Sequence, residues 1–436
     1  MSIAAPPRGL ASLVSPLTGV VKRLDERLLE PADALLHSYW CEAADTDLGE
    51  DAAGMRAGGG WAAAPQRARA AAVAEAVERY SAAIPPADGF RVASAAEVGN
   101  AAIAPERLRR FRDEQLAGTA FAHLRSDTRV RWACGSELPG ATPAWAPAQF
   151  VTLGGLDELA GEPALTIPTS NGLACGTTFW GAVLSALLEV IERDAFTATW
   201  AARLSLPLLT WYGDRRLEAF ERQRLQPSGL RYAAVDLSAL LDVPVVLAVV
   251  TTPAAVPGPT AVGAAASTVA ADAVERALCE AGAAFAAARA LRRVQPDRVL
   301  AADGSDIETF DDRVLHYADP ARASRLAFLT ASGERRHVDD VARVGGAAPR
   351  EVIDGLCARL AARGALAYAF DVTAPDIAAA GLHVVRVLSP ELCPLDAAHR
   401  QRFLGVPRLL TAASDAGLRS RPLRPGEVNP DPHPFP

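Results

Sequence analysis

The feature that most constrains this chain is a long apolar segment that carries charges of its own. Residues 179–200, FWGAVLSALLEVIERDAFTATW, have the pattern of one helix with apolar side chains on nearly every side. Such a helix is expected to be buried. Glu189, Glu192 and Arg193 would be buried with it, and buried carboxylates are costly unless they are paired or bound to a cation. The segment therefore predicts a core helix with a charged site on it.

The pattern ExxER, which this helix contains, occurs twice. The two copies are Glu75-Glu78-Arg79 and Glu189-Glu192-Arg193. Residues at i, i+3 and i+4 share one helix face, so each copy presents two carboxylates and a guanidinium in one direction. Ser185 lies one turn before the second copy, and Arg276 and Glu280 repeat the i, i+4 spacing in a third helical segment. Two interpretations stay open: surface helices with intrahelical ion pairs, and a hard-oxygen site for Mg²⁺ with substrate phosphates.

Composition and missing motifs exclude several classes of protein. With 44 Lys and Arg against 51 Asp and Glu, the net charge of −7 argues against a protein that coats nucleic acid. The six cysteines are scattered singly, which favours reduced thiols in a cytoplasmic protein over a zinc site. The phosphate-binding loop GxxxxGK[ST] is absent, because Gly60 is followed by Trp61 rather than Lys. No dinucleotide motif GxGxxG follows a strand either.

One stretch is long enough to raise the question of a membrane span. Residues 243–271 carry no charge, but Pro253, Pro257 and Pro259 interrupt them. We interpret VPVVLAVV as a buried strand that ends in a Pro/Gly turn. No interaction with a membrane is expected.

Strand-like and helical segments alternate along the chain. Helical patterning covers residues 67–83, 179–200 and 269–293, with a further helix expected within 400–413. The strand-like runs are TRVRWACG, AQFVTLGG, YAAVDLS, VPVVLAVV, ALAYAFDVT and LHVVRVLSP. Residues 301–346 have a charged, irregular pattern and are interpreted as a surface excursion. No linker separates two cores, so we predict one large α+β unit for the 436 residues.

An ordered set of motifs resembles the YcaO family, specifically its azoline-forming members. The motifs are SPLTGVV at 15–21, AVAEAVERYSA at 72–82, SNGLACGTT at 170–178, SALLEVIERDAF at 185–196, VERALCEA at 274–281, DVTAPDI at 371–377, VVRVLSPELCPL at 384–395 and the final PHPFP at 432–436. The resemblance implies a single YcaO-type domain, with β-sheets flanked by helices and an ATP site between the helices. It divides the chain into an N-terminal tail, 1–14, and a catalytic domain, 15–436, that ends in a PxPxP tail at 430–436.

The resemblance also implies an activity in the biosynthesis of thiazole/oxazole-modified antibiotic peptides. A Cys, Ser or Thr side chain of a ribosomally made precursor attacks the preceding backbone carbonyl. ATP then phosphorylates the former amide oxygen, which leaves as phosphate and gives a thiazoline or (methyl)oxazoline. An amide oxygen is a poor leaving group, and carboxylate-held divalent ions would neutralise the charges that develop.

Roles for individual residues follow from the same resemblance. The implied Mg²⁺ ligands are Glu75, Glu78, Glu192 and Glu280, with Glu189 beside them. The implied nucleotide contacts are Ser15, Arg79, Ser185, Glu189, Arg193 and Arg276. Pro432, Pro434 and Pro436 match the PxPxP ending, which in the family runs into the active site and orients it. On composition alone, the tail could equally be a flexible polyproline segment. Ala71 and Ala283 stand where the family commonly has Ser and Gln.

The implied partners are a precursor peptide and other proteins. Because the resemblance accounts for the whole chain, a separate protein is expected to bind the precursor's leader; it would be of the ubiquitin-activating-enzyme-like or ocin-ThiF-like kind. A flavin dehydrogenase is a further expected partner, and the chain is expected to form a cytoplasmic homodimer. Two alternatives stay open: YcaO-type thioamide or amidine formation, and a non-catalytic scaffold subunit of a peptide-modifying complex.

Overall fold

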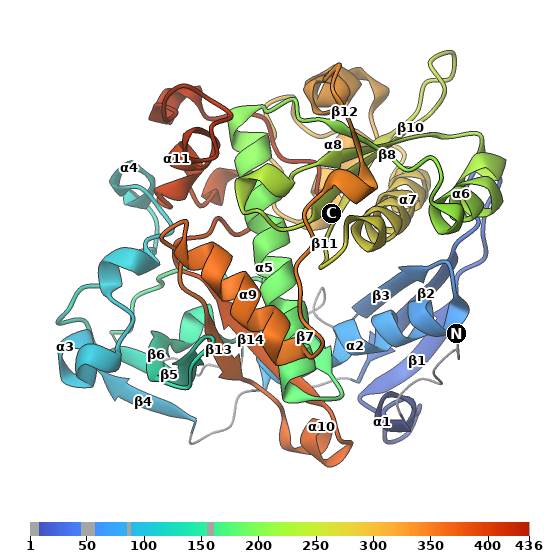
Figure 1. The fold of residues 1–436 in the computed structure, drawn as a ribbon. Helices are drawn as coiled ribbons and strands as arrows, with labels where there is room; N and C mark the ends of the chain where they lie inside the picture. Colours follow the sequence, from blue (N-terminus) through green and yellow to red (C-terminus); the bar gives the residue numbers. More distant parts are fainter. Residues whose placement is uncertain (1–7, 45–56, 85–88, 155–160, 436) are drawn as a thin grey trace.

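Two antiparallel-rich sheets flank one central helix, and a third sheet packs on a second long helix. The computed structural model describes residues 8–44, 57–84, 89–154 and 161–435. Helix α5 (Phe179–Ala202) runs through the middle of the molecule, with a sheet on either side of it (Figure 1). The largest buried cluster of apolar side chains lies along α5 and includes Ile191, Phe196 and Trp200. The predicted core helix and the α+β class are confirmed.

The sheets differ in size and in the helices that cover them. The first has the order β1-β2-β3, formed by Val21–Glu26, His37–Ala43 and Ala57–Ala62. The second has the order β11-β10-β9-β8-β12, formed by Thr260–Ala266, Val245–Thr251, Arg231–Asp236, Leu208–Thr210 and Arg335–His337. The third has the order β4-β5-β13-β14-β7, formed by Phe90–Ala93, Val130–Glu137, Tyr368–Asp371, His383–Leu388 and Leu173–Gly176, and β6 (Pro143–Pro147) pairs with β5.

Two further long helices complete the layers that position the site. Helix α2 (Pro65–Ala83) packs on the first sheet, and α7 (Ala270–Val294) packs on β10 and β11 of the second. Strands β10 and β11 are buried along nearly their whole length, which explains their uninterrupted apolar sequence. The shorter helices are α1 (Arg8–Ser12), α3 (Ala95–Val98), α4 (Asp113–Leu116), α6 (Arg215–Phe220), α8 (Phe310–Tyr317), α9 (Pro349–Ala361), α10 (Pro375–Ala379) and α11 (Arg408–Asp415).

The ends of the long helices follow from local sequence. Helix α2 has Pro65 in its first turn, where proline removes no hydrogen bond. Helix α5 begins at Thr178, whose hydroxyl accepts a hydrogen bond from the Gly181 N–H at 3.1 Å, and ends at Arg203 in the left-handed conformation, with φ of 50°. Helix α7 ends in Arg292 and Arg293, which suit the negative end of its dipole.

Two predictions of local structure were wrong. In AQFVTLGG, residues 148–154 form a short 3-10 turn, Ala148–Phe150, and irregular backbone rather than a strand, while Gly155 lies outside the described residues. Residues 301–346 are not a surface excursion, because α8 lies in this segment and its Arg313, His316 and Tyr317 are buried. Charges that suggested exposure are satisfied by residues far away in the sequence: Arg313 is 0% exposed and pairs with Asp396.

The described part of the predicted N-terminal tail is packed on the domain. Residues 8–12 form α1, and Leu10 and Leu13 are buried in the same cluster as Val73 and Val77 of α2. Residues 8–14 are therefore not separate from the core, although the division at residue 15 stays a prediction.

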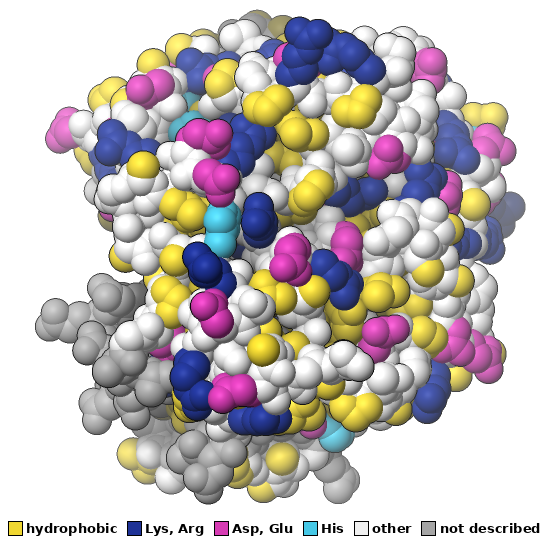
Figure 2. Space-filling view, turned by 90° about the vertical axis from the view of Figure 1, so that its left-hand side faces the viewer, with side chains coloured by type: hydrophobic (Ala, Val, Ile, Leu, Met, Phe, Trp, Pro, Cys, Tyr) yellow, Lys and Arg dark blue, Asp and Glu magenta, His cyan; other side chains and the backbone are white. Residues whose placement is uncertain are grey.

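The surface carries mixed charge. On the face shown in Figure 2, Lys and Arg side chains are interspersed with Asp and Glu, and small apolar patches lie between them. Among the described residues, no helix is both long and apolar enough to cross a membrane.

Candidate functional site

The first carboxylate of the predicted site is held where β3 touches α2. A Cβ atom on Gly60 would lie 1.9 Å from the Ala68 carbonyl oxygen, so only glycine allows this close approach. The contact brings the Gly59 N–H within 2.6 Å of a Glu75 carboxylate oxygen. Arg79 donates a hydrogen bond to the other oxygen of Glu75, also at 2.6 Å. Glu75 is thus fixed from two sides.

Glu78 connects α2 to the neighbouring strand β7. Its Oε1 accepts a hydrogen bond from the Cys175 N–H at 2.7 Å. Burial raises the pKa of Glu78 well above the ordinary value, and the negative charges of Glu189 and Glu75 raise the pKa further. Glu78 therefore lies between one carboxylate of its own helix and one of α5.

Glu192 and Glu280 meet over one strand. Glu192 of α5 accepts a hydrogen bond from the Ala266 N–H at 3.1 Å, and Glu280 of α7 accepts one from the Ala264 N–H at 3.0 Å. A Cβ atom on Gly263 would lie 2.4 Å from the Ala281 nitrogen, so a glycine is again what lets α7 approach β11. Strand β11 thereby holds a carboxylate from each of two helices.

The pKa values show that these carboxylates share one electrostatic environment. Burial, and after it the charge of Glu192, raises the pKa of Glu280 to about 8. Burial raises the pKa of Glu189 to about 7, with a further raising contribution from Glu192. Burial also raises the pKa of Glu192, although Arg193 and Arg276 oppose the shift. From Glu75 to Glu280, each carboxylate therefore acts on the next across three helices.

Two arginines lie beside the glutamate cluster, by which we mean Glu75, Glu78, Glu189, Glu192 and Glu280. The Nε of Arg193 is 3.6 Å from an oxygen of Glu189 and of Glu192, beyond hydrogen-bond distance, and it has no hydrogen-bond partner. Burial alone would lower the pKa of Arg193, but the three nearby carboxylates outweigh burial and raise the pKa. Arg276 donates to the Ala266 carbonyl oxygen at 3.1 Å.

The glutamate cluster fits a hard divalent cation by its chemistry. Within the described ranges, no group of three or more His, Cys, Asp or Glu side chains is gathered closely enough to hold a metal ion as it stands. Yet all five members carry oxygen ligands, which Mg²⁺ prefers. Buried like charges with raised pKa values are also costly without a cation. The donor set thus fits Mg²⁺, and the individual ligands stay a prediction.

The two serines of the prediction lie differently. Ser185 is exposed on α5, one turn before Glu189. The hydroxyl of Ser15 accepts hydrogen bonds within its own turn, from the N–H groups of Leu17 and Thr18 at 3.3 Å. Among the contacts of the described residues, none joins Ser15 to the glutamate cluster, so its predicted role stays untested. Ala71 is exposed, whereas Ala283 is buried.

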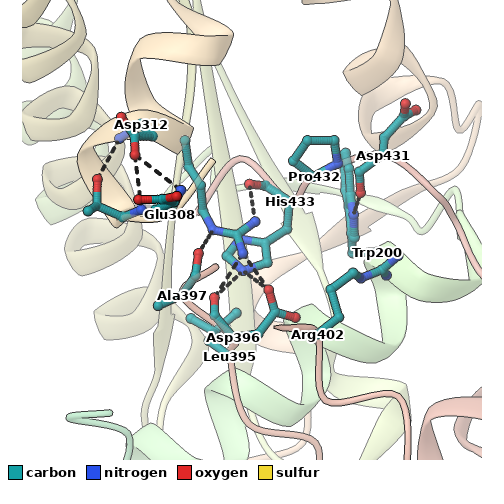
Figure 3. Close-up of polar contacts among 12 residues, drawn as sticks. Trp200, Glu308, Asp312, Leu395, Asp396, Ala397, Arg402, Asp431, Pro432 and His433 are labelled. Carbon is teal, nitrogen blue, oxygen red and sulfur yellow. Dashed lines mark hydrogen bonds and ion pairs between the residues drawn. The ribbon is translucent and has the colours of Figure 1, made fainter. Parts of the chain in front are cut away.

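The C-terminal tail is not free but docked on α5 and α8. Trp200 donates to the Asp431 carbonyl oxygen at 3.1 Å, and Tyr317 donates to the Pro432 carbonyl oxygen at 2.6 Å. The His433 ring nitrogen contacts the Asp396 carbonyl oxygen at 2.9 Å, as Figure 3 shows. Pro432 and Pro434 are buried, while Pro436 lies outside the described residues. A free polyproline tail is therefore excluded.

Phe435 carries the tail to the charged site. It is 0% exposed, and its ring centroid lies 4.8 Å from that of Phe196. The guanidinium carbon of Arg193 lies 4.3 Å from the Phe435 ring centroid, which is cation–π geometry. The tail thus ends against the arginine that faces Glu189 and Glu192.

Sequence reasoning missed several groups that shape the site. The N–H groups of Gly59 and Cys175 hold Glu75 and Glu78, but backbone donors leave no signal in side-chain patterns. Arg386 was not singled out, although its charge acts on Glu189. The motif VVRVLSP held a signal for Arg386, since a charge inside a buried strand needs a reason.

A comparison with family models identifies the class that this fold and site define. The YcaO family model, described as "YcaO cyclodehydratase, ATP- and Mg²⁺-binding", matches residues 59–393. The chain belongs to the YcaO family. The predicted family and fold class are confirmed, and the family is described as binding the predicted cofactors, ATP and Mg²⁺.

Solved structures show the same fold. A heterocyclase in complex with substrate and cofactor superposes with a TM-score of 0.79 at 24% identity, over 99% of this chain and 57% of that one. The heterocyclase TruD gives a TM-score of 0.66 at 22% identity, over 85% of this chain and 52% of that one. YcaO from Methanopyrus kandleri, bound with AMPPCP and Mg²⁺, gives 0.59 at 21% identity, over 86% of each chain.

The first two of these structures are longer than the present protein. The chain spans 57% and 52% of their lengths. A search of curated protein sequences found no match.

Proposed function

We propose that this protein uses ATP to convert Cys, Ser or Thr residues of a ribosomally made peptide into thiazolines or (methyl)oxazolines. The observation that carries the proposal is the set of five carboxylates on α2, α5 and α7 beside Arg193 and the docked tail, in which burial raises the pKa values of Glu78, Glu189, Glu192 and Glu280. Membership of an ATP- and Mg²⁺-binding family gives this cluster a cation to hold.

The glutamate cluster would hold Mg²⁺. Glu75 and Glu78 would contribute ligands from α2, Glu192 from α5 and Glu280 from α7, with Glu189 next to them. Bound MgATP supplies the phosphoryl group that turns the amide oxygen into a leaving group. Before the cation arrives, β11 orients Glu192 and Glu280 through the Ala266 and Ala264 N–H groups, so less ordering is needed at binding.

Cationic and hydroxyl side chains around the cluster would contact the nucleotide. Arg193 and Arg276 face the cluster from α5 and α7, and Arg79 from α2. The unpartnered Nε of Arg193 leaves a donor for a phosphate oxygen. Ser185, exposed on α5, and Ser15 are the proposed hydroxyl contacts.

The tail would orient the site rather than react. Phe435 covers the guanidinium of Arg193 and keeps water from that side. The contacts from Trp200 and Tyr317 to Asp431 and Pro432 fix the backbone that carries Phe435. Pro432, Pro434 and Pro436 reduce the entropy lost when the segment docks.

The reaction also needs other molecules. We propose that a separate leader-peptide-binding protein, of the ubiquitin-activating-enzyme-like or ocin-ThiF-like kind, presents the precursor. A flavin dehydrogenase would act on the azoline product. A cytoplasmic homodimer is our proposal for the working state. Two of the similar structures are of an E. coli microcin synthetase complex, McbBCD, one of them with pro-MccB17 bound.

The test is a reconstituted reaction. The protein is incubated with ATP, Mg²⁺, the leader-binding protein and the precursor encoded beside its gene, and peptide mass and released phosphate are measured. Loss of one water per ring, with one phosphate released, is the expected result. Replacement of oxygen by sulfur in the presence of sulfide would instead assign thioamide formation. If the peptide mass does not change and no phosphate is released, the non-catalytic scaffold remains as the alternative.

A further inference from the structure

A cavity adjoins the glutamate cluster at Arg193, which lines it. Its wall is formed by α5, the end of β14, the segment after β14 and residues from 149–150 and 166–171. Three arginines line it: Arg110, Arg193 and Arg386. Of all its lining residues, none is Asp or Glu. The cavity is therefore a basic counterpart to the acidic cluster, and the two share Arg193.

Arg386 places a buried positive charge on the cavity wall. It is 3% exposed and lies on β14. Its guanidinium donates to the carbonyl oxygens of Val151, Thr169 and Asn171, at 3.0 and 2.8 Å for the first two. Neutral carbonyls satisfy its hydrogen bonds without cancelling its charge, and burial lowers its pKa to about 10. No carboxylate among the described residues forms an ion pair with it.

The positive charge of Arg110 has fewer neighbouring acceptors than that of Arg386. It is 4% exposed, and burial lowers its pKa to about 10. Its hydrogen bond, to the Pro390 carbonyl oxygen, is long at 3.4 Å. The guanidinium carbon lies 5.3 Å from the Phe150 ring centroid. In the part of the chain that the structure describes, Arg110 has no carboxylate partner, so most of its charge and donor capacity remain unused.

Two unpartnered polar atoms belong to side chains of the same wall. The hydroxyl of Ser389 is buried, with the residue 4% exposed, and has no hydrogen-bond partner. The Nε of Arg193 also has no hydrogen-bond partner, although it lies 3.6 Å from a carboxylate oxygen of Glu189 and of Glu192. Buried polar groups are normally satisfied, so the unpartnered Ser389 hydroxyl indicates a missing partner at this cavity. A negatively charged acceptor would also offset the guanidinium charges.

We propose that this cavity is an oxyanion site, in which Arg110, Arg386, Arg193 and Ser389 bind a phosphate or carboxylate group. Phosphate is the occupant we favour. That choice rests on the proposed function, in which each ring closure releases one phosphate beside Arg193, and the cavity would receive it. A carboxylate of the bound peptide is the other source of the same chemistry.

The experiment measures anion binding by calorimetry without ATP, Mg²⁺ or peptide. Inorganic phosphate and acetate are titrated separately into the intact protein at constant ionic strength. Arg110→Met is expected to lower affinity for the bound anion at least tenfold. Arg109→Met is the matched control, because Arg109 is the adjacent residue and is exposed, and its affinity should match that of the original protein.

Ser389→Ala keeps the test valid if Arg110→Met fails to fold. Its hydroxyl has no partner to lose, so folding should survive while affinity falls about threefold. If phosphate affinity falls in Arg110→Met or Ser389→Ala, the site is supported with phosphate as its occupant. If only acetate affinity falls in these variants, the site is supported with a carboxylate as its occupant. Equal binding in these variants and the control overturns the proposal. Because no nucleotide or peptide is present, this outcome is independent of whether cyclodehydration is observed.

Discussion

Glu192 and Asp194 lie two residues apart on α5 and are both buried, at 5% and 0% exposure, yet their surroundings are opposite. Asp194 faces a countercharge: both its oxygens lie 2.9 Å from the Arg408 Nε, and Oδ1 also accepts from the Cys393 N–H. Glu192 faces other carboxylates across β11. Two positions along a helix turn a side chain by roughly 200°, so one helix serves two regions.

The difference separates structural charges from functional ones. On the Asp194 side, charges are paired and the neighbouring tail is locked by contacts such as those of Arg325 and Arg203 with Asp431. On the Glu192 side, carboxylates outnumber the arginines beside them, and backbone N–H groups hold Glu75, Glu78, Glu192 and Glu280. A buried ion pair is neutralised by its own partner. A buried cluster in which carboxylates are in excess requires a bound cation.

The largest expected effect is on the paired side. Asp194→Ala leaves Arg408 buried without its countercharge, which should lower the free energy of unfolding by about 3–5 kcal/mol. Asp25→Ala, which removes an exposed partner of Arg23, should cost less than about 1 kcal/mol. Urea unfolding followed by circular dichroism measures both. Equal losses would show that Asp194 is not the anchor of its side.

The C-terminal tail contacts both the Asp194 side and the Glu192 side of α5. Two substitutions of Phe435 separate its apolar packing from its contact with Arg193. Phe435→Ala should cost about 3 kcal/mol of packing, or undock the tail, and should lower turnover. Phe435→Leu keeps most of the apolar volume and loses the ring over Arg193, so about 1 kcal/mol is expected. Tyr212→Ala, at an exposed aromatic residue, is the control. Unfolding and proteolysis of the tail are the measurements; indifference to Phe435→Ala would contradict docking.

The smallest effect is pH dependence on the tail side. Burial lowers the pKa of His316 and of His399 from 6.5 to about 4, and the pKa of His433 is lowered as well. Between pH 6.5 and 4 the unfolded chain therefore binds more protons than the folded one, so stability that is complete above pH 6.5 is lost as the pH falls. The contribution of these three histidines to the melting temperature should therefore fall in this window, whereas the raised pKa values of Glu189 and Glu280 act in the opposite direction.

A variant can assign this slope. Neither ring nitrogen of His316 has a hydrogen-bond partner, so His316→Phe loses no hydrogen bond and should remove this residue's share of the pH dependence of the melting temperature between pH 6.5 and 4. His37→Phe, at a half-buried histidine beside Glu26, should leave the slope as it was. If the pH dependence of the melting temperature is unchanged in His316→Phe, His316 does not contribute to it.

The sequence predicted the helices of the site better than the contacts that complete it. The i, i+3, i+4 spacing of Glu75, Glu78 and Arg79 reports on its own helix, so their shared face could be anticipated. The close packing of α2 on β3 and of α7 on β11 depends on Gly60 and Gly263, which appear as ordinary glycines in the sequence.

The other gaps have the same cause. Arg313 looked exposed because its partner Asp396 lies 83 residues further along the chain. No role was predicted for Asp194 from the sequence, although its ion pair with Arg408 on α11 gives it a structural role. Local periodicity identifies which side chains share a face, whereas pairing across the fold decides whether a buried charge is structural or available to a ligand.

The most direct measurement is Mg²⁺-dependent ATP affinity in Glu192→Gln, with Glu114→Gln as the exposed control. Removing one carboxylate of the glutamate cluster should weaken MgATP binding at least tenfold and lower ATP turnover by about a hundredfold. The melting temperature without Mg²⁺ should not fall, because burial makes the ionised form of Glu192 costly and its charge also raises the pKa of Glu280. Unchanged MgATP affinity in a folded Glu192→Gln protein would contradict the assignment of this cluster as the ATP–magnesium site.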